Sequence, residues 1–157
     1  MKLKFEPNVT DVPASCQLVV EQPEMYSAVT VNGKPVSFAG SGYYRDTVFR
    51  AADINGLLIP GRNEIVLSLT FVSGIPTSLN ARARYGTEIE SIYLIGDFAV
   101  KAEQADQPLT DTYRNKDGVL PKKPIHSFKR FTLTKEAAAF TGDLVTQGYP
   151  FYAGEKG

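Results

Sequence analysis

Apolar and polar side chains alternate along much of the chain, and this pattern predicts half-buried β-strands. The longest alternating run spans residues 63–72. Four of its apolar residues would share the face that points into a core: Ile65, Leu67, Leu69 and Phe71. The pattern also predicts strands at residues 2–5, 16–21, 29–31, 89–95, 98–100 and 131–133. Because no segment carries a long apolar stripe of helical period, we predict an all-β fold: an antiparallel β-sandwich or jelly roll of about eight strands.

Turn residues separate these runs. Asn32-Gly33 predicts a tight hairpin, because both residue types tolerate a positive φ, and Pro60-Gly61 predicts another turn. Thr134 would cap one helical turn over residues 135–139. The polar stretch 103–124 predicts a surface loop, or a hairpin with Asp117-Gly118 at its tip. We divide the chain into a sandwich domain, residues 1–140, and a linker or tail, residues 141–157.

The charge balance and hydropathy narrow the choice of partners. Seventeen basic residues match seventeen acidic ones, so the chain lacks the positive charge typical of nucleic-acid binders. No apolar run reaches the roughly 18 residues that cross a bilayer, and residues 1–6 lack the apolar core of a signal peptide. We therefore predict no nucleic-acid and no membrane partner. The compartment stays open, and a secreted or periplasmic parent protein is compatible with these features.

Candidate catalytic groups are few. A Ser-His-Asp arrangement would have to use His126, the single histidine, for which we favour a surface or packing role. A Cys16–His126 dyad is the alternative, but Cys16 falls on the apolar face of a strand and would be a small buried residue. Glu88 and Glu90 would share one strand face near Asp97, as an acid pair or as a solvated surface, and we favour the surface. We predict no catalytic residue in this chain.

Metal and cofactor sites are not predicted either. A structural zinc site needs several His or Cys ligands, and the chain has one of each. Asp106 and Asp111 form a weak candidate pair for calcium at the rim of a sandwich. Gly40-Ser41-Gly42 opens no predicted helix and so lacks the context of a phosphate-binding loop.

Sugar binding requires fewer specific groups than catalysis or metal binding. Aromatic rings that stack on a pyranose and a few fixed polar groups are enough. Two short segments have this character, and they supply the candidate carbohydrate-binding residues Tyr43, Tyr44, Arg45, Arg84 and Tyr85. The alternative is that the tyrosine rings cover the core and only their hydroxyl groups meet water.

Several segments resemble the sugar-binding, galactose-binding-like sandwich of family 2-type glycoside hydrolases: residues 18–21, 29–36, 43–46, 53–54 and 58–67. Two more are similar to segments of large α-L-rhamnosidase-like glycoside hydrolases: residues 89–100 and 142–154. The resemblance implies an accessory sandwich whose catalytic domain lies elsewhere in a larger protein, and it implies that residues 141–157 lead toward a following domain. It carries no catalytic residue onto this chain.

Three functions follow as hypotheses. The first is a non-catalytic carbohydrate-binding or accessory module of a glycoside hydrolase, with a glycan and the neighbouring domains as partners. The second is a structural spacer without a sugar site. The third, a small stand-alone enzyme, is disfavoured because no usable catalytic constellation is present.

Overall fold

The chain folds as an all-β protein. A computed structural model describes residues 1–72, 86–104, 109–110, 124–125 and 128–135. Within these residues the elements are strands, apart from one short 3-10 helix, η1 (Pro23–Met25). The strand content confirms the all-β class predicted from alternation.

The first sheet is antiparallel and has the strand order β1-β9-β4-β5. Its strands are β1 (Lys2–Phe5), β9 (Ile65–Leu69), β4 (Tyr26–Val31) and β5 (Lys34–Pro35). Leu67 of β9 is aligned with Leu3 on one side and Val29 on the other. The longest alternating run of the sequence therefore supplies a central strand, which explains its regular pattern.

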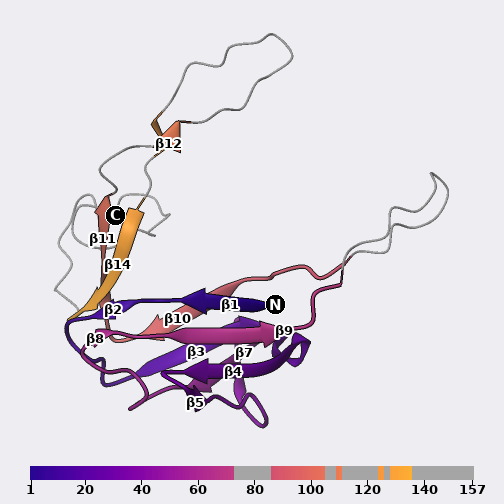
Figure 1. Cartoon of the computed structure of the whole chain (residues 1–157). Helices are drawn as coiled ribbons and strands as arrows, with labels where there is room; N and C mark the ends of the chain where they lie inside the picture. Colours follow the sequence, from indigo (N-terminus) through magenta and orange to yellow (C-terminus); the bar gives the residue numbers. More distant parts are fainter. Residues whose placement is uncertain (73–85, 105–108, 111–123, 126–127, 136–157) are drawn as a thin grey trace.

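The second sheet has the order β10-β3-β7-β6 and is also antiparallel. Its strands are β10 (Ile92–Gly96), β3 (Cys16–Glu21), β7 (Asp46–Asp53) and β6 (Gly42–Tyr44). Figure 1 shows that β10, β3 and β7 of this sheet lie in the main body of the molecule together with the strands of the first sheet.

The two sheets share a buried core. It takes Val29, Ile65 and Leu67 from the first sheet and Leu18 and Val20 from the second. Side chains from two sheets that fill one core are the arrangement of a β-sandwich. The structure is thus consistent with the predicted sandwich.

A third set of strands brings together segments that lie far apart in the sequence. It has the order β11-β14-β2-β8, with β11 (Ala99–Gln104), β14 (Phe128–Thr134), β2 (Asn8–Val9) and β8 (Gly61–Arg62). β11 and β14 project away from the main body (Figure 1). β14 runs parallel to β2, so the expectation of a purely antiparallel fold is wrong at this pair. The two-residue strand β2 also pairs antiparallel with β8. This pairing fixes the direction of β2, and β14 then lies alongside it.

The long run at residues 63–72 is shorter as a strand than predicted. Ile65, Leu67 and Leu69 are buried, which confirms the predicted face, but Phe71 is 57% exposed and its predicted burial is wrong. β9 ends at Leu69 because its neighbours end there: Leu69 is aligned with Tyr26, the first residue of β4, and accepts a hydrogen bond from the amino group of Met1. Beyond this point no described strand remains to pair with it.

Other strands begin or end at residues different from those predicted, and some predicted features lie outside the described residues. The strand predicted at 89–95 begins at Ile92, whereas those predicted at 98–100 and 131–133 extend to 99–104 and 128–134. β12 (Leu109–Thr110) pairs antiparallel with β13 (Pro124–Ile125), which favours the hairpin interpretation of residues 103–124. The proposed tip of that hairpin, the helical turn after Thr134 and the tail 141–157 lie outside the described residues.

The predicted hairpin at Asn32-Gly33 is confirmed. Val31 of β4 is aligned with Lys34 of β5, and the two residues between them have φ angles of 50° and 76°. Positive φ at both positions is what a two-residue hairpin of this kind requires. Gly61 also has a positive φ, 92°, in the turn predicted after Pro60.

A buried asparagine connects this hairpin to the loop before β9. The Asn63 side chain is 1% exposed and makes four hydrogen bonds. Its Oδ1 accepts from the Ile59 amide at 2.8 Å and from Asn32 Nδ2 at 2.7 Å. Its Nδ2 donates to the carbonyl oxygens of Ile59 at 2.8 Å and Gly61 at 3.0 Å. Every hydrogen-bonding capacity of the amide is used, so the group can be buried without an unsatisfied polar atom.

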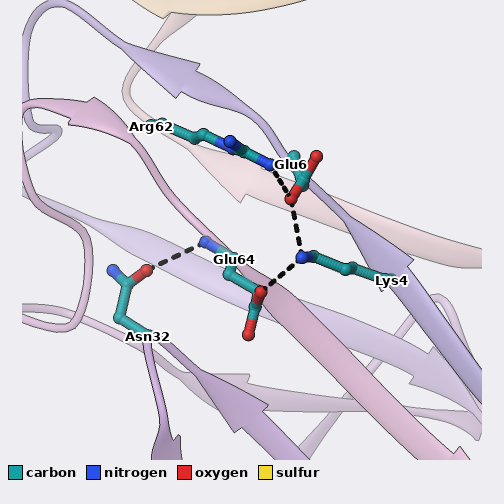
Figure 2. A network of polar contacts seen from close by, with 5 residues as sticks. All are labelled: Lys4, Glu6, Asn32, Arg62 and Glu64. Atoms are coloured by element: carbon teal, nitrogen blue, oxygen red, sulfur yellow. Dashed lines mark hydrogen bonds and ion pairs between the residues drawn. The ribbon is translucent and has the colours of Figure 1, made fainter.

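A charged network lies on the surface next to this asparagine pair (Figure 2). Lys4 Nζ is 2.8 Å from Glu6 and 2.7 Å from Glu64, and Arg62 also pairs with Glu6. The hydrogen bonds to both carboxylates raise the pKa of Lys4, and those from Lys4 and Arg62 lower the pKa of Glu6. Because these side chains are solvent-exposed, they contribute little to stability one by one. The backbone N–H of Glu64 donates to Asn32 Oδ1, which links the network to the hairpin.

The first prediction concerns the core. Leu67 is fully buried on the central strand β9, so Leu67→Ala should lower the free energy of unfolding by roughly 2–5 kcal/mol. The matched control Phe71→Ala removes an exposed side chain and should change it by about 0.5 kcal/mol or less. Chemical denaturation measures both values. Equal losses for the two variants would show that the register of β9 is misassigned.

The second prediction concerns the buried amide. Asn63→Ala removes four hydrogen bonds and strands their buried partners, so it should cost about 2–4 kcal/mol. Asn55 accepts one bond, from the Cys16 amide at 2.7 Å, and Asn55→Ala should cost only about 1 kcal/mol. The same denaturation experiment compares the two. A cost for Asn63→Ala no larger than that for Asn55→Ala would contradict a central role for this amide.

Candidate functional site

The aromatic residues selected from the sequence lie on an edge strand of the second sheet. Tyr43 and Tyr44 belong to β6, and Arg45 connects β6 to β7. The Tyr43 side chain is 63% exposed, whereas Tyr44 is half-buried. The other two candidates, Arg84 and Tyr85, lie outside the described residues. The structure therefore places Tyr43, Tyr44 and Arg45 on one hairpin.

The tip of this hairpin is tight. Tyr44 is aligned with Asp46, and the residue between them, Arg45, has a φ of 67°, which is uncommon for any residue except glycine. Asp46 Oδ1 accepts from the Val48 amide at 3.1 Å, which stabilises the start of β7. The guanidinium of Arg45 lies 5.5 Å from the centre of the Tyr44 ring, within the range of a cation–π contact. Arg45 is thus held against its own hairpin.

A second arginine, Arg50 of β7, was not selected from the sequence and has a more informative position. It is aligned with Val20 of β3 and with Tyr43 of β6, and aligned neighbours share one face of a sheet. Since Val20 belongs to the buried core, Arg50 and Tyr43 lie on the inner face of the second sheet. The sequence around Arg50 does not alternate in polarity, so the pattern gave no signal for this orientation.

An open cleft of about 640 Å³ lies beside Arg50, between β4 of the first sheet and β7 of the second. Its lining comes from both sheets and from the segments next to them: residues 23–24, 26–29, 36–40, 47–48 and 50. Tyr26 and Val29 of the core, and Val36 and Phe38 packed against it, give the cleft an apolar component. A volume of this size is within the usual range for sites that hold small molecules.

Polar groups surround this apolar component. Glu24, Ser27, Ser37 and Thr47 line the cleft and are exposed, while Arg50 is half-buried. Carboxylate and hydroxyl oxygens accept hydrogen bonds, hydroxyl groups also donate, and a guanidinium donates in a planar fork. The cleft therefore presents both donors and acceptors above a partly apolar surface.

One contact orients Arg50. Its Nη2 donates to the carbonyl oxygen of Ser41 at 2.7 Å, and the Ser41 hydroxyl donates in turn to the Phe38 carbonyl at 2.9 Å. These bonds tie the segment that lines one side of the cleft to β7. Within the described part of the chain, Arg50 has no carboxylate within ion-pair distance.

A second cavity, of about 380 Å³, opens among β1, β10 and β14. Its lining includes Phe5, Ile92, Leu94 and an aromatic pair, Phe128 and Phe131, whose ring centres are 5.5 Å apart. The predicted sugar-binding residues that the structure describes, Tyr43, Tyr44 and Arg45, line neither this cavity nor the first cleft, and the two spaces differ in their aromatic content.

The strand predicted to carry Glu88 and Glu90 does not extend to these two residues. Glu88 and Glu90 precede β10, which begins at Ile92, so the expectation that they share a strand face is wrong. The sheet pairing of β10 starts only where β3 offers a partner, with Ile92 aligned to Val20. Glu88 and Asp97 are exposed. Burial, and secondly the charge of Glu90, raise the pKa of the Tyr26 hydroxyl.

Cys16 is a core residue. It is 1% exposed and belongs to the apolar cluster, as its place in the alternating pattern predicted. Burial, and secondly the charge of Asp53, raise the pKa of its thiol to about 11. The reactive thiolate is therefore scarce at neutral pH. His126, the proposed dyad partner, lies outside the described residues.

Within the described part of the chain, no three His, Cys, Asp or Glu side chains are grouped so that they could hold a metal ion. Asp106 and Asp111, the weak calcium candidates, lie outside it. No helix among the described residues is long and apolar enough to cross a membrane.

Comparisons with models of protein families, with curated proteins and with solved structures found no match to this chain. The resemblance noted in the sequence therefore stays an expectation.

The third prediction concerns Cys16. Since its thiol is buried and has a raised pKa, it should react much more slowly with Ellman's reagent in the native protein than in the denatured chain at the same mildly alkaline pH. The chain has one cysteine, so the signal comes from this residue alone. Equal rates in the two states would show that Cys16 is accessible and that β3 does not occupy the core.

Proposed function

We propose that this chain is a non-catalytic carbohydrate-binding module, a jelly roll of the galactose-binding type that belongs to a larger glycoside hydrolase. The cleft between β4 and β7 is its sugar site. The observation that carries this proposal is the composition of the cleft, which joins an apolar component to polar side chains. The exposed Tyr43 lies outside this lining, on the neighbouring strand β6.

The chemistry of a sugar fits these groups. A pyranose presents several hydroxyl groups, each able to donate and accept, together with an apolar face of C–H groups. Glu24 can accept hydrogen bonds from the hydroxyl groups, Ser37 can accept and donate, and Arg50 can donate. The Thr47 hydroxyl donates to Asp46, so it is left to accept. Tyr43 is aligned with Arg50 and exposes most of its surface, so its ring is available to stack on the apolar face.

Binding fits the cleft better than hydrolysis. Glycoside hydrolysis uses two carboxyl groups on opposite sides of the sugar. Among the described residues that line the cleft, one carboxylate is present, that of Glu24. We therefore assign hydrolysis to a catalytic domain elsewhere in the parent protein.

The spacer hypothesis is the second candidate, and the second cavity favours it. Apolar and aromatic side chains line that cavity, and Phe5 on its edge is 43% exposed. Exposed apolar patches often mark contact surfaces. In this alternative, a neighbouring domain of the parent would cover the patch and the cleft at Arg50 would bind no sugar.

The fourth prediction is weak but localised sugar binding. An open cleft buries little of a monosaccharide, so we expect dissociation constants near millimolar, about 4 kcal/mol of binding free energy. Nuclear magnetic resonance titration with a panel of monosaccharides should shift the amides of residues 24–29, 37–43 and 47–50 first. Tyr43→Ala should weaken binding by about 1–2 kcal/mol through the loss of stacking.

Tyr93→Ala is the matched control. Tyr93 is also exposed, at 45%, but it lies on β10, at the opposite edge of the second sheet. Its removal should leave the sugar affinity unchanged. Shifts confined to the cavity at β1, β10 and β14 would refute the site, and the absence of shifts with every sugar in the panel would favour the spacer.

A further inference from the structure

Arg50 points to the class of sugar that the cleft recognises. Resting on the proposed function, we infer that the ligand carries a carboxylate, as uronic acids do, and that the guanidinium of Arg50 binds it.

The position of Arg50 is unusual for a structural residue. Inner-face positions of a sandwich normally carry apolar side chains, and Arg50 shares that face with Val20 and with Ala52, which is 3% exposed. An arginine can lie there when its aliphatic stem covers apolar surface and its head reaches a polar space. The cleft supplies that space, since Arg50 lines it.

Most N–H donors of the Arg50 guanidinium remain available to a ligand. The guanidinium has five N–H groups, and the Ser41 carbonyl accepts from Nη2. That carbonyl is neutral, and no described carboxylate lies within ion-pair distance of Arg50. A half-buried charge is favoured when an opposite charge pairs with it, and a carboxylate matches the planar fork of a guanidinium with two parallel hydrogen bonds.

Two other arginines, Arg45 and Arg62, already have partners. Arg45 lies over the Tyr44 ring, and Arg62 pairs with Glu6. Neither lines the cleft. Arg50 is therefore the cation in the described lining of the cleft that is placed to receive an anion.

The carboxylate of Glu24 would repel an anionic ligand, and its exposure to solvent decides the strength of that repulsion. It lies on η1, lines the same cleft and is exposed, so water and salt screen its charge. Arg50 is half-buried, and its attraction is screened less. We therefore expect net attraction of one carboxylate, with Glu24 accepting hydrogen bonds from the sugar hydroxyl groups instead.

Three matched sugars test the inference: galactose, galacturonate and the methyl ester of galacturonate. The ester keeps the shape of the uronate but removes its charge. Titration of the whole chain should give about five- to tenfold tighter binding of galacturonate than of either neutral sugar, as expected for a charge-assisted contact in a partly exposed site. Added salt should reduce this ratio and leave the neutral sugars unaffected.

Three variants assign the effect to residues. Arg50→Gln should bring the ratio of uronate to ester affinity to about one, whereas Arg50→Lys should keep part of it, because a lysine retains the charge but loses the fork. Glu24→Gln should raise the ratio, since it removes the repulsion. Arg62→Gln is the control for the loss of one positive charge; Arg62 lies outside the cleft, and its removal should not change the ratio.

The outcomes separate the two proposals. Galactose and the ester binding as tightly as galacturonate would overturn the role of Arg50 and leave the sugar site standing. No binding of any of the three, together with none in the wider panel, would overturn the proposed function itself. A uronate preference that survives Arg50→Gln in a variant with an unchanged melting curve would also overturn the inference, because another cation would then carry it.

Discussion

The fully bonded amide of Asn63 is the constraint on which the arrangement of the strands depends. It joins the loop at Ile59 and Gly61 to the hairpin residue Asn32, and so aligns the start of β9 with β4. The same turn directs Gly61 and Arg62 into β8, which holds β2 and, through it, β14. A polar group inside an apolar core specifies one arrangement, because shifting it would leave its partners unsatisfied.

The cleft exists because the edge strands of the two sheets are short on one side of the molecule. On the side of β4 and β7, the outermost strands are β5, with two residues, and β6, with three. Strands this short cover little of the space between the sheets. The inner face of β7 is therefore open to solvent at Arg50, while the register that β9 imposes on β4 places Tyr26 and Val29 on the opposite wall.

Among the described residues, the surface network and Arg50 show two contrasting surroundings for a charged side chain. Lys4, Glu6, Arg62 and Glu64 neutralise one another on the surface beside the Asn63 turn, and that cluster is complete without a ligand (Figure 2). Arg50 is different, because it bonds to a backbone carbonyl and faces an open space. This contrast is why we propose Arg50, and not the surface network, as the group that would bind a ligand.

The sequence by itself determined the class of the fold and much of its core. Period-two alternation identified the strands that contain Leu18 and Leu67, and Asn32-Gly33 identified a hairpin, because these signals are local and depend only on neighbouring residues. The end of β9 before Phe71, the parallel pair of β14 and β2, and the inner position of Arg50 were decided by the tertiary structure. Each depends on which strand lies alongside, and pairing between residues far apart in the chain leaves no periodic trace in either segment.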